Sequence, residues 1–153
     1  MRHVDDVIEI EVRIAADPKT VFGFLTDPAK FVRWLGLQAS LHPIPGGIFR
    51  VDANGRDVVS GTYVEVVPYR KVVFTWGWEG GGGRVPAGST TVEITLRAEG
   101  DGTLLTLRHS GLSGVDRDKH AGGWSHYIKR LTIVAQGGEP GADPLASADI
   151  AHG

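Results

Sequence analysis

One long helical pattern, at residues 116–135, follows a succession of shorter segments in which apolar and polar residues alternate. The positions that share one face of this helix are His120, Trp124, Tyr127, Leu131 and Val134. An antiparallel sheet has to bury one of its faces against another element. Because only this helix is long enough to cover such a sheet, the order of the elements constrains the fold more than any other feature.

The alternating segments begin at residues 7–14, where Glu9, Glu11 and Arg13 separate apolar side chains, as is typical of a half-buried antiparallel strand. Asp17 and Asp27 then each stand as an N-cap before a proline at the first helical position, which predicts two short helices. Further strands are expected at residues 37–41, 48–51, 57–67, 70–78, 89–98 and 103–109.

This order predicts an α+β helix-grip fold. A curved antiparallel sheet of about six to seven strands should wrap around the long C-terminal helix, with two short helices after the first strand. Residues 1–136 should form one domain. The tail, residues 137–153, is rich in Gly, Pro, Ala, Asp and Ser and is expected to be disordered.

Composition excludes several classes of function. The chain has no cysteine, so disulfides, thiolate nucleophiles and cysteine-ligated zinc are excluded. Its 16 basic and 18 acidic side chains are interspersed without a basic stripe, so we expect no nucleic-acid partner. Neither a signal-peptide core nor an apolar run of ~20 residues is present. We therefore expect no membrane association and a cytoplasmic location.

The alternation within each strand predicts which side chains share the concave face and could line a ligand pocket. Phe74, Trp76 and Trp78 stand at alternating positions and would form a broad apolar wall. Such an aromatic stripe is more often core than pocket. The predicted pocket-lining residues are Trp34, Phe49, Thr62, Val64, Phe74, Trp76, Trp78, Ile94, Leu107, His109, His120, Trp124, Tyr127 and Leu131.

Two of these residues, His109 and His120, would approach each other if both face the cavity, which suggests an acid–base pair or a metal pair. His120 and His126 are six residues apart and lie on different helix faces, and no carboxylate is spaced to complete a metal site. The glycine run 80–83 lacks the Lys-Ser/Thr of a phosphate loop. We therefore expect no metal, no cofactor and no assignable catalytic residue, and the plain interpretation is a hydrogen-bonded histidine pair.

An ordered set of short motifs resembles the START-like (SRPBCC, polyketide-cyclase-like) superfamily. Within it, the chain is similar to the branch named for the activator of heat-shock protein ninety ATPase. The motifs are IAADPKTVF at 14–22, LTDP at 25–28, WLG at 34–36, PGGIFR at 45–50, GTYVEVVP at 61–68, VFTW at 73–76, GTLLTLRH at 102–109 and GW at 123–124.

The resemblance implies a helix-grip fold with a hydrophobic cavity between the sheet and the long helix, but a fold hosts many functions. The leading hypothesis is a non-catalytic carrier of an apolar small molecule, with a link to stress. The alternatives are a cyclase or hydrolase that uses a cavity histidine, and a co-chaperone-like interaction module. The branch is named for a larger co-chaperone with a further N-terminal domain, so we do not expect chaperone activation here. A homodimer fits such domains.

Overall fold

The computed structural model describes residues 7–80 and 85–147, so most of the glycine run and the end of the tail lie outside the described residues. It contains a seven-stranded antiparallel sheet with strand order β1-β7-β6-β5-β4-β3-β2, which confirms the predicted fold class. The elements are β1 Ile8–Ile14, α1 Pro18–Thr26, α2 Pro28–Phe31, β2 Gln38–Leu41, β3 Ile48–Asp52, β4 Val58–Val67, β5 Lys71–Trp76, β6 Thr90–Glu99, β7 Gly102–Ser110, α3 Gly114–Ala135 and a 3₁₀ helix, η2, Pro144–Ser147.

Both short helices begin where the sequence predicts. The Asp17 carboxylate accepts a hydrogen bond from the backbone N–H of Thr20 at 2.8 Å and so caps α1. Asp27 caps α2 in the same way through the N–H of Ala29, at 3.0 Å. Because Asp27 is also the C-cap of α1, the two helices follow one another without an intervening loop.

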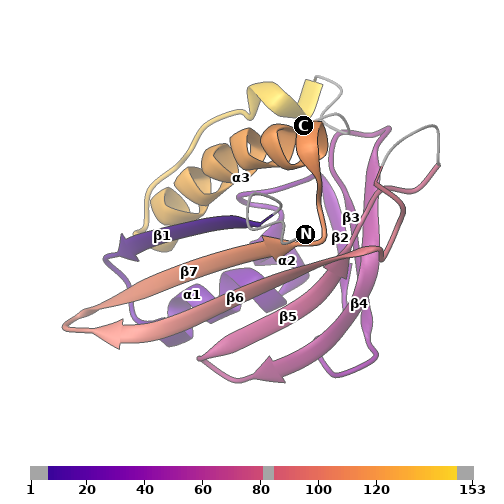
Figure 1. Cartoon of the computed structure of the whole chain (residues 1–153). Helices are drawn as coiled ribbons and strands as arrows, with labels where there is room; N and C mark the ends of the chain where they lie inside the picture. The colour runs from indigo at the N-terminus through magenta and orange to yellow at the C-terminus, as the bar shows by residue number, and fades with distance from the viewer. Residues whose placement is uncertain (1–6, 81–84, 148–153) are drawn as a thin grey trace.

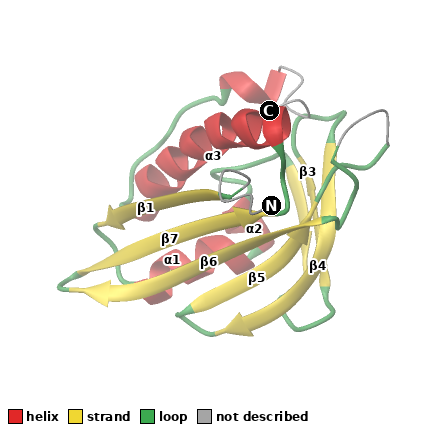
Figure 2. Ribbon diagram, in the orientation of Figure 1, coloured by secondary structure: helices red, strands yellow, loops and turns green. Residues whose placement is uncertain are grey.

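Figures 1 and 2 show the sheet curving around α3, with α1 and α2 behind the strands β5 to β7. The first strand pairs with the last, since Ile8 is opposite His109 and Ile14 is opposite Thr103. Strands β5, β6 and β7 turn alternate side chains inward, as predicted, and these form one core with the buried face of α3.

Strand β4 departs from the predicted alternation. Tyr63 is opposite Phe74 and Glu65 is opposite Val73, so Val64 is an extra residue that forms a β-bulge. A shift of one residue moves every side chain to the other face of a sheet. Tyr63 is therefore buried, while Thr62 and Val64 are exposed. Their assignment to the concave face was wrong, because the alternation was extended through the bulge.

The described part of the tail lies against α3. Residues 137–147, here called the strap, follow α3 and end in η2. Within the strap, Asp143 accepts hydrogen bonds from the side chains of His126 and Tyr127 on α3. Arg130 donates to the carbonyl oxygen of Gly141 at 3.1 Å. These hydrogen bonds connect residues 137–147 to polar side chains of α3, which the composition of the tail did not predict.

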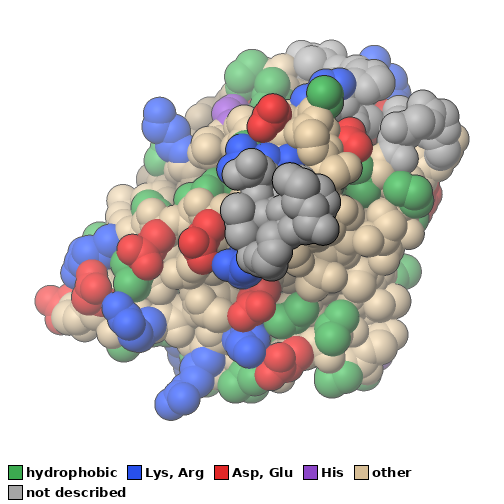
Figure 3. All heavy atoms as spheres, viewed as in Figure 1, with side chains coloured by type: hydrophobic (Ala, Val, Ile, Leu, Met, Phe, Trp, Pro, Cys, Tyr) green, Lys and Arg blue, Asp and Glu red, His purple; other side chains and the backbone are tan. Residues whose placement is uncertain are grey.

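Figure 3 shows basic and acidic side chains interspersed over the visible face, without a continuous patch of either sign. Among the described residues, no helix is long and apolar enough to cross a membrane.

Candidate functional site

A small cavity, the central cavity, lies between α3 and the inner face of the sheet. It has a volume of about 20 Å³, which is room for roughly one water molecule, whereas sites for drug-sized ligands measure roughly 300–1,000 Å³. Large aromatic side chains fill most of the space that the fold encloses. The residues that line the central cavity are Leu35, Ala53, Val59, Trp76, Trp78, His120, Gly123, Trp124 and Tyr127.

Next to this cavity, fully buried His109 is held by hydrogen bonds on both ring nitrogens. The indole N–H of Trp124 donates to Nδ1 at 2.9 Å. The hydroxyl of Thr90 donates to the carbonyl oxygen of Trp76, so its oxygen, 2.8 Å from Nε2, accepts a hydrogen bond from the N–H of that nitrogen. The contacts therefore assign His109 the neutral form with its proton on Nε2.

The second buried histidine, His120, has the opposite tautomer. Its Nδ1 lies 2.8 Å from the backbone carbonyl oxygen of Asp116, which can only accept, so Nδ1 carries the proton. Its Nε2 accepts the indole N–H of Trp78 at 3.2 Å. The rings of His120 and His109 have centroids 5.6 Å apart, in an edge-to-face arrangement.

The environment keeps both rings neutral. Burial and, to a lesser degree, the nearby His120 lower the pKa of His109 from 6.5 to about 3. Burial also lowers the pKa of His120, although its bond to Asp116 opposes the shift. Because both nitrogens of each ring have partners, a proton transfer through either ring would first have to break one of these hydrogen bonds. In this conformation the pair joins α3 to β6, to β7 and to Trp78 just after β5.

Some buried polar atoms have no partner among the described residues. They include the indole N–H of Trp76, which lines the central cavity, and the hydroxyl of Tyr63. Burial raises the pKa of Tyr63, so that hydroxyl stays protonated. Buried groups of this kind are rare in folded proteins, and each calls for an explanation. Trp76 is thus a residue of the cavity wall whose indole N–H has no acceptor among the described residues.

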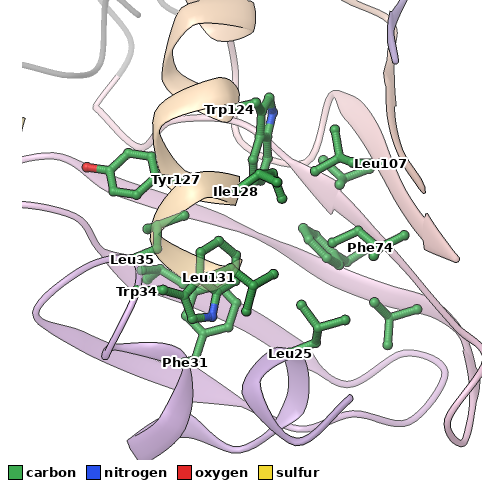
Figure 4. Close-up of a cluster of buried hydrophobic side chains, with 14 of the residues drawn as sticks. Leu25, Phe31, Trp34, Leu35, Phe74, Leu107, Trp124, Tyr127, Ile128 and Leu131 are labelled. Atoms are coloured by element: carbon green, nitrogen blue, oxygen red, sulfur yellow. The ribbon is translucent and has the colours of Figure 1, made fainter. Parts of the chain in front are cut away.

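Tyr127 connects the central cavity to the strap. Figure 4 shows the Trp124 and Tyr127 side chains pointing away from α3 in different directions, with Leu35 near Tyr127. The Tyr127 hydroxyl donates to Asp143 at 2.7 Å. Burial opposes ionisation of Asp143, but hydrogen bonds from Tyr127, His126 and Leu145 outweigh burial and hold its pKa below the usual range.

A second space, the strap hollow, lies between the strap and the segment after α2. It is open to solvent and has a volume of about 370 Å³. Leu35 lines both spaces and so forms part of the wall between them. The residues that line the strap hollow are Val32, Leu35, Gly36, Leu37, Arg130, Gly141, Ala142 and Asp143.

The structure brings some of the predicted pocket residues together and separates others. Those that line the central cavity are Trp76, Trp78, His120, Trp124 and Tyr127. Seven more are buried in the core without lining it: Trp34, Phe49, Phe74, Ile94, Leu107, His109 and Leu131. Thr62 and Val64 lie on the outer face.

Sequence reasoning missed four lining residues. Val59 shares the inward face of β4 with Tyr63 and would have been found had the bulge been recognised. No pattern in the sequence marks Ala53, Leu35 or Gly123 as facing the cavity. Ala53 and Leu35 stand outside the regular elements, and Gly123 carries no side chain to mark a face. Within the described ranges, no group of three or more His, Cys, Asp or Glu side chains could hold a metal ion.

Comparison with known proteins places the chain in a family. A model of the family described as activator of Hsp90 ATPase homolog 1-like protein matches residues 15–136. The solution structure of an AHSA1-like protein from Rhizobium etli is 44% identical; the match covers 90% of this chain and 86% of that chain, with a TM-score of 0.71. The comparison with curated proteins found no match.

Two further solved structures share the fold. DynU16, from the dynemicin biosynthetic locus, is 28% identical with a TM-score of 0.77; the match covers 89% of this chain but 49% of DynU16. The Aha1 dimer from Colwellia psychrerythraea is 18% identical with a TM-score of 0.73, covers 86% of this chain and 97% of its own, and shows the fold alone. The family model and the Rhizobium relative confirm the resemblance noted in the sequence: the chain belongs to the activator of Hsp90 ATPase homolog 1-like family.

Proposed function

We propose that this protein binds an apolar small molecule carrying a hydrogen-bond acceptor, between the sheet and α3. The observation that carries the proposal is the buried indole N–H of Trp76, which has no acceptor among the described residues and belongs to a cavity wall with two further indoles. Aromatic walls with a few polar groups are typical of small-molecule sites. A carbonyl or ether oxygen on the ligand would satisfy the Trp76 donor.

Binding requires the central cavity to open, since about 20 Å³ does not admit such a ligand. Leu35 separates the cavity from the strap hollow of about 370 Å³. Tyr127 belongs to the same wall and is tied to the strap through Asp143. Release of the strap would free Tyr127 and allow Leu35 to turn aside, joining the two spaces. The closed form described here would then be the unliganded state.

The test is a titration with 2-acetonaphthone, a neutral aromatic ketone, followed by NMR of the ¹⁵N-labelled indole groups. We expect the Trp76, Trp78 and Trp124 indole signals to shift and saturate together. Trp34 serves as an internal control, because it does not line the cavity and its indole N–H already donates to the carbonyl oxygen of Phe24 at 2.9 Å. No shift, or an equal shift of all four indoles, would contradict the proposal.

Two variants sharpen this test. Trp76→Phe removes the free donor and should weaken ketone binding about tenfold, the equivalent of one hydrogen bond. Asp143→Ala loosens the strap and should tighten binding, because the apparent Kd rises when only a fraction of molecules is open. Weaker binding by Asp143→Ala would show that the strap does not gate the cavity.

The cyclase or hydrolase alternative receives less support, since His109 and His120 use both ring nitrogens in hydrogen bonds.

The alternative of a protein-interaction module has one observation in its favour. Ile48 of β3 and Val64 of β4 are 47% and 52% exposed on the outer face of the sheet. If this face binds a chaperone, the double variant I48E/V64E should abolish any effect of the protein on chaperone ATPase rate. An unchanged effect would remove this alternative.

A further inference from the structure

A separate groove, the turn groove, lies at the opposite end of β5 from the central cavity. Its walls come from the first residue of α1, Pro18, from the β4–β5 turn at Pro68, Tyr69 and Arg70, and from Leu96 and Arg97 near the end of β6. Its volume is about 500 Å³, within the range of small-molecule sites. The six residues of β5 put roughly 20 Å between this groove and Trp76.

The turn that forms one wall is held in a conformation that its sequence does not favour. The backbone N–H of Arg70 donates to the carbonyl oxygen of Val67 at 2.9 Å, which closes a four-residue turn. Pro68 precedes Tyr69, whose φ is 68°, the pattern of a type II turn. The position of Tyr69 normally takes glycine or asparagine, because a side chain is strained there.

Tyr69 is the only non-glycine residue with a positive φ in the described part of the chain. Its ring contacts the edge of Phe22 on α1, with centroids 5.6 Å apart, yet the residue stays 47% exposed. The N–H of Leu96 donates to the carbonyl oxygen of Arg70 at 2.7 Å and fixes the turn to β6. An exposed aromatic ring is thus kept over the groove at a position where glycine would fit without strain, and such strain clusters at binding sites.

Two arginines, Arg70 and Arg97, belong to the groove wall. Arg13 of β1 and Lys71 of β5 pair with Glu99 and Glu65, at 3.4 and 3.3 Å. Arg70 and Arg97, in contrast, are exposed and form no ion pair with any residue of the described ranges. Two guanidinium groups free to make bidentate hydrogen bonds are suited to a carboxylate, sulfonate or phosphate group.

We propose that the turn groove binds a small anion with an aromatic body. Arg70 and Arg97 would hold the anionic group, while Tyr69 and the two prolines would contact the ring. This site goes beyond the proposed function, because its ligand is charged and its residues are not shared with the central cavity.

The test is an NMR titration of the ¹⁵N-labelled full chain with sodium 2-naphthoate, with neutral 2-acetonaphthone as the matched probe. We expect saturable shifts of the Tyr69, Arg70 and Arg97 amides with naphthoate, and at least about tenfold weaker effects there with the ketone. The double variant R70Q/R97Q should raise the naphthoate Kd about tenfold or more. Arg56→Gln, which removes an exposed arginine outside the groove, should leave it unchanged.

Tyr69→Gly separates binding from folding. Glycine accepts the positive φ, so this variant should stay folded, with an unfolding midpoint close to that of the native chain, and should bind naphthoate several-fold more weakly. The proposal is overturned if naphthoate leaves these amides unmoved, or if R70Q/R97Q binds it as tightly as the native chain. Naphthoate shifts confined to the Trp76, Trp78 and Trp124 indoles would also overturn it, while supporting the central cavity as a site.

Discussion

At the scale of single residues, two tryptophans of similar burial have opposite hydrogen-bond states. The indole N–H of Trp124 donates to His109, whereas that of Trp76 has no acceptor among the described residues. Removing the Trp124 indole N–H leaves the buried Nδ1 of His109 without a donor, at a cost of about 1–3 kcal/mol. Removing the Trp76 indole N–H leaves no acceptor unsatisfied and carries no such cost.

Trp124→Phe should therefore destabilise the protein by about 1–3 kcal/mol more than Trp76→Phe, although both variants lose the same atoms. The measurement is the free energy of unfolding of each variant in urea at neutral pH. Equal losses would mean that the Trp124–His109 bond contributes nothing, or that a bound water satisfies Trp76.

The neutral state of His109 predicts a pH dependence of stability. Burial lowers its pKa to about 3 in the folded protein, from the ordinary value of 6.5 that applies when the chain unfolds. As the pH falls below 6.5, His109 becomes protonated in the unfolded chain but stays neutral in the folded protein. The contribution of neutral His109 to the free energy of unfolding is therefore fully present above pH 6.5. It decreases by about 1.4 kcal/mol per pH unit below pH 6.5 and stops changing below about pH 3.

Between pH 7.5 and 5.5, where most carboxylates stay ionised, His109→Gln should show a shallower loss of unfolding free energy than the native chain. The ring signals of His109 in the native protein should meanwhile stay constant in NMR spectra. A shift of those signals near pH 6.5 would show that the ring titrates freely and that the hydrogen-bonded pair is open.

At the scale of elements, the strap depends on one carboxylate. Asp143 has a side chain only 9% exposed and accepts hydrogen bonds from Tyr127, His126 and the backbone N–H of Leu145. Hydrogen bonds to charged groups contribute about 1.5–3 kcal/mol. Glu139 offers a control in the same segment, since it pairs with Arg33 through a side chain that is 82% exposed.

Asp143→Ala should lower the free energy of unfolding by about 1.5–3 kcal/mol, and Glu139→Ala by at most about 1 kcal/mol. Amide hydrogen exchange at Leu145 should accelerate in the Asp143 variant alone. Unchanged exchange and stability would mean that the strap is not held by this carboxylate.

At the scale of the whole molecule, the sheet is complete and covered only when residues from both halves of the chain contribute to it. Strand β1 pairs with β7, and α3 covers the inner face with Trp124, Ile128 and Leu131. A chain that ends after residue 136 keeps all seven strands and α3, whereas one that ends after residue 112 loses the cover of the sheet.

We expect the 1–136 chain to remain folded with a lower unfolding midpoint, and the 1–112 chain to be unfolded or aggregated. Circular dichroism and the dispersion of NMR amide signals distinguish these states. Loss of folding in the 1–136 chain would show that the strap is part of the domain and that the predicted domain boundary at residue 136 is wrong.

Local chemistry in the sequence determined the order and type of the elements. Asp17 and Asp27 cap the short helices, and alternation sets the inward residues of β5, β6 and β7, because these signals act over a few neighbouring residues. The long helix was predicted at 116–135 and spans Gly114–Ala135. The same signals correctly placed Trp76, Trp124 and His120 at the interior.

Only the tertiary structure decided the rest. The bulge at Val64 depends on pairing with β5, so alternation along β4 alone put Thr62 and Val64 on the wrong face. The volume of the central cavity depends on how side chains from five separate segments fill one space, which no single segment encodes. The strap contacts α3 because Asp143 accepts hydrogen bonds from His126 and Tyr127, and the polar composition of the tail does not predict this contact.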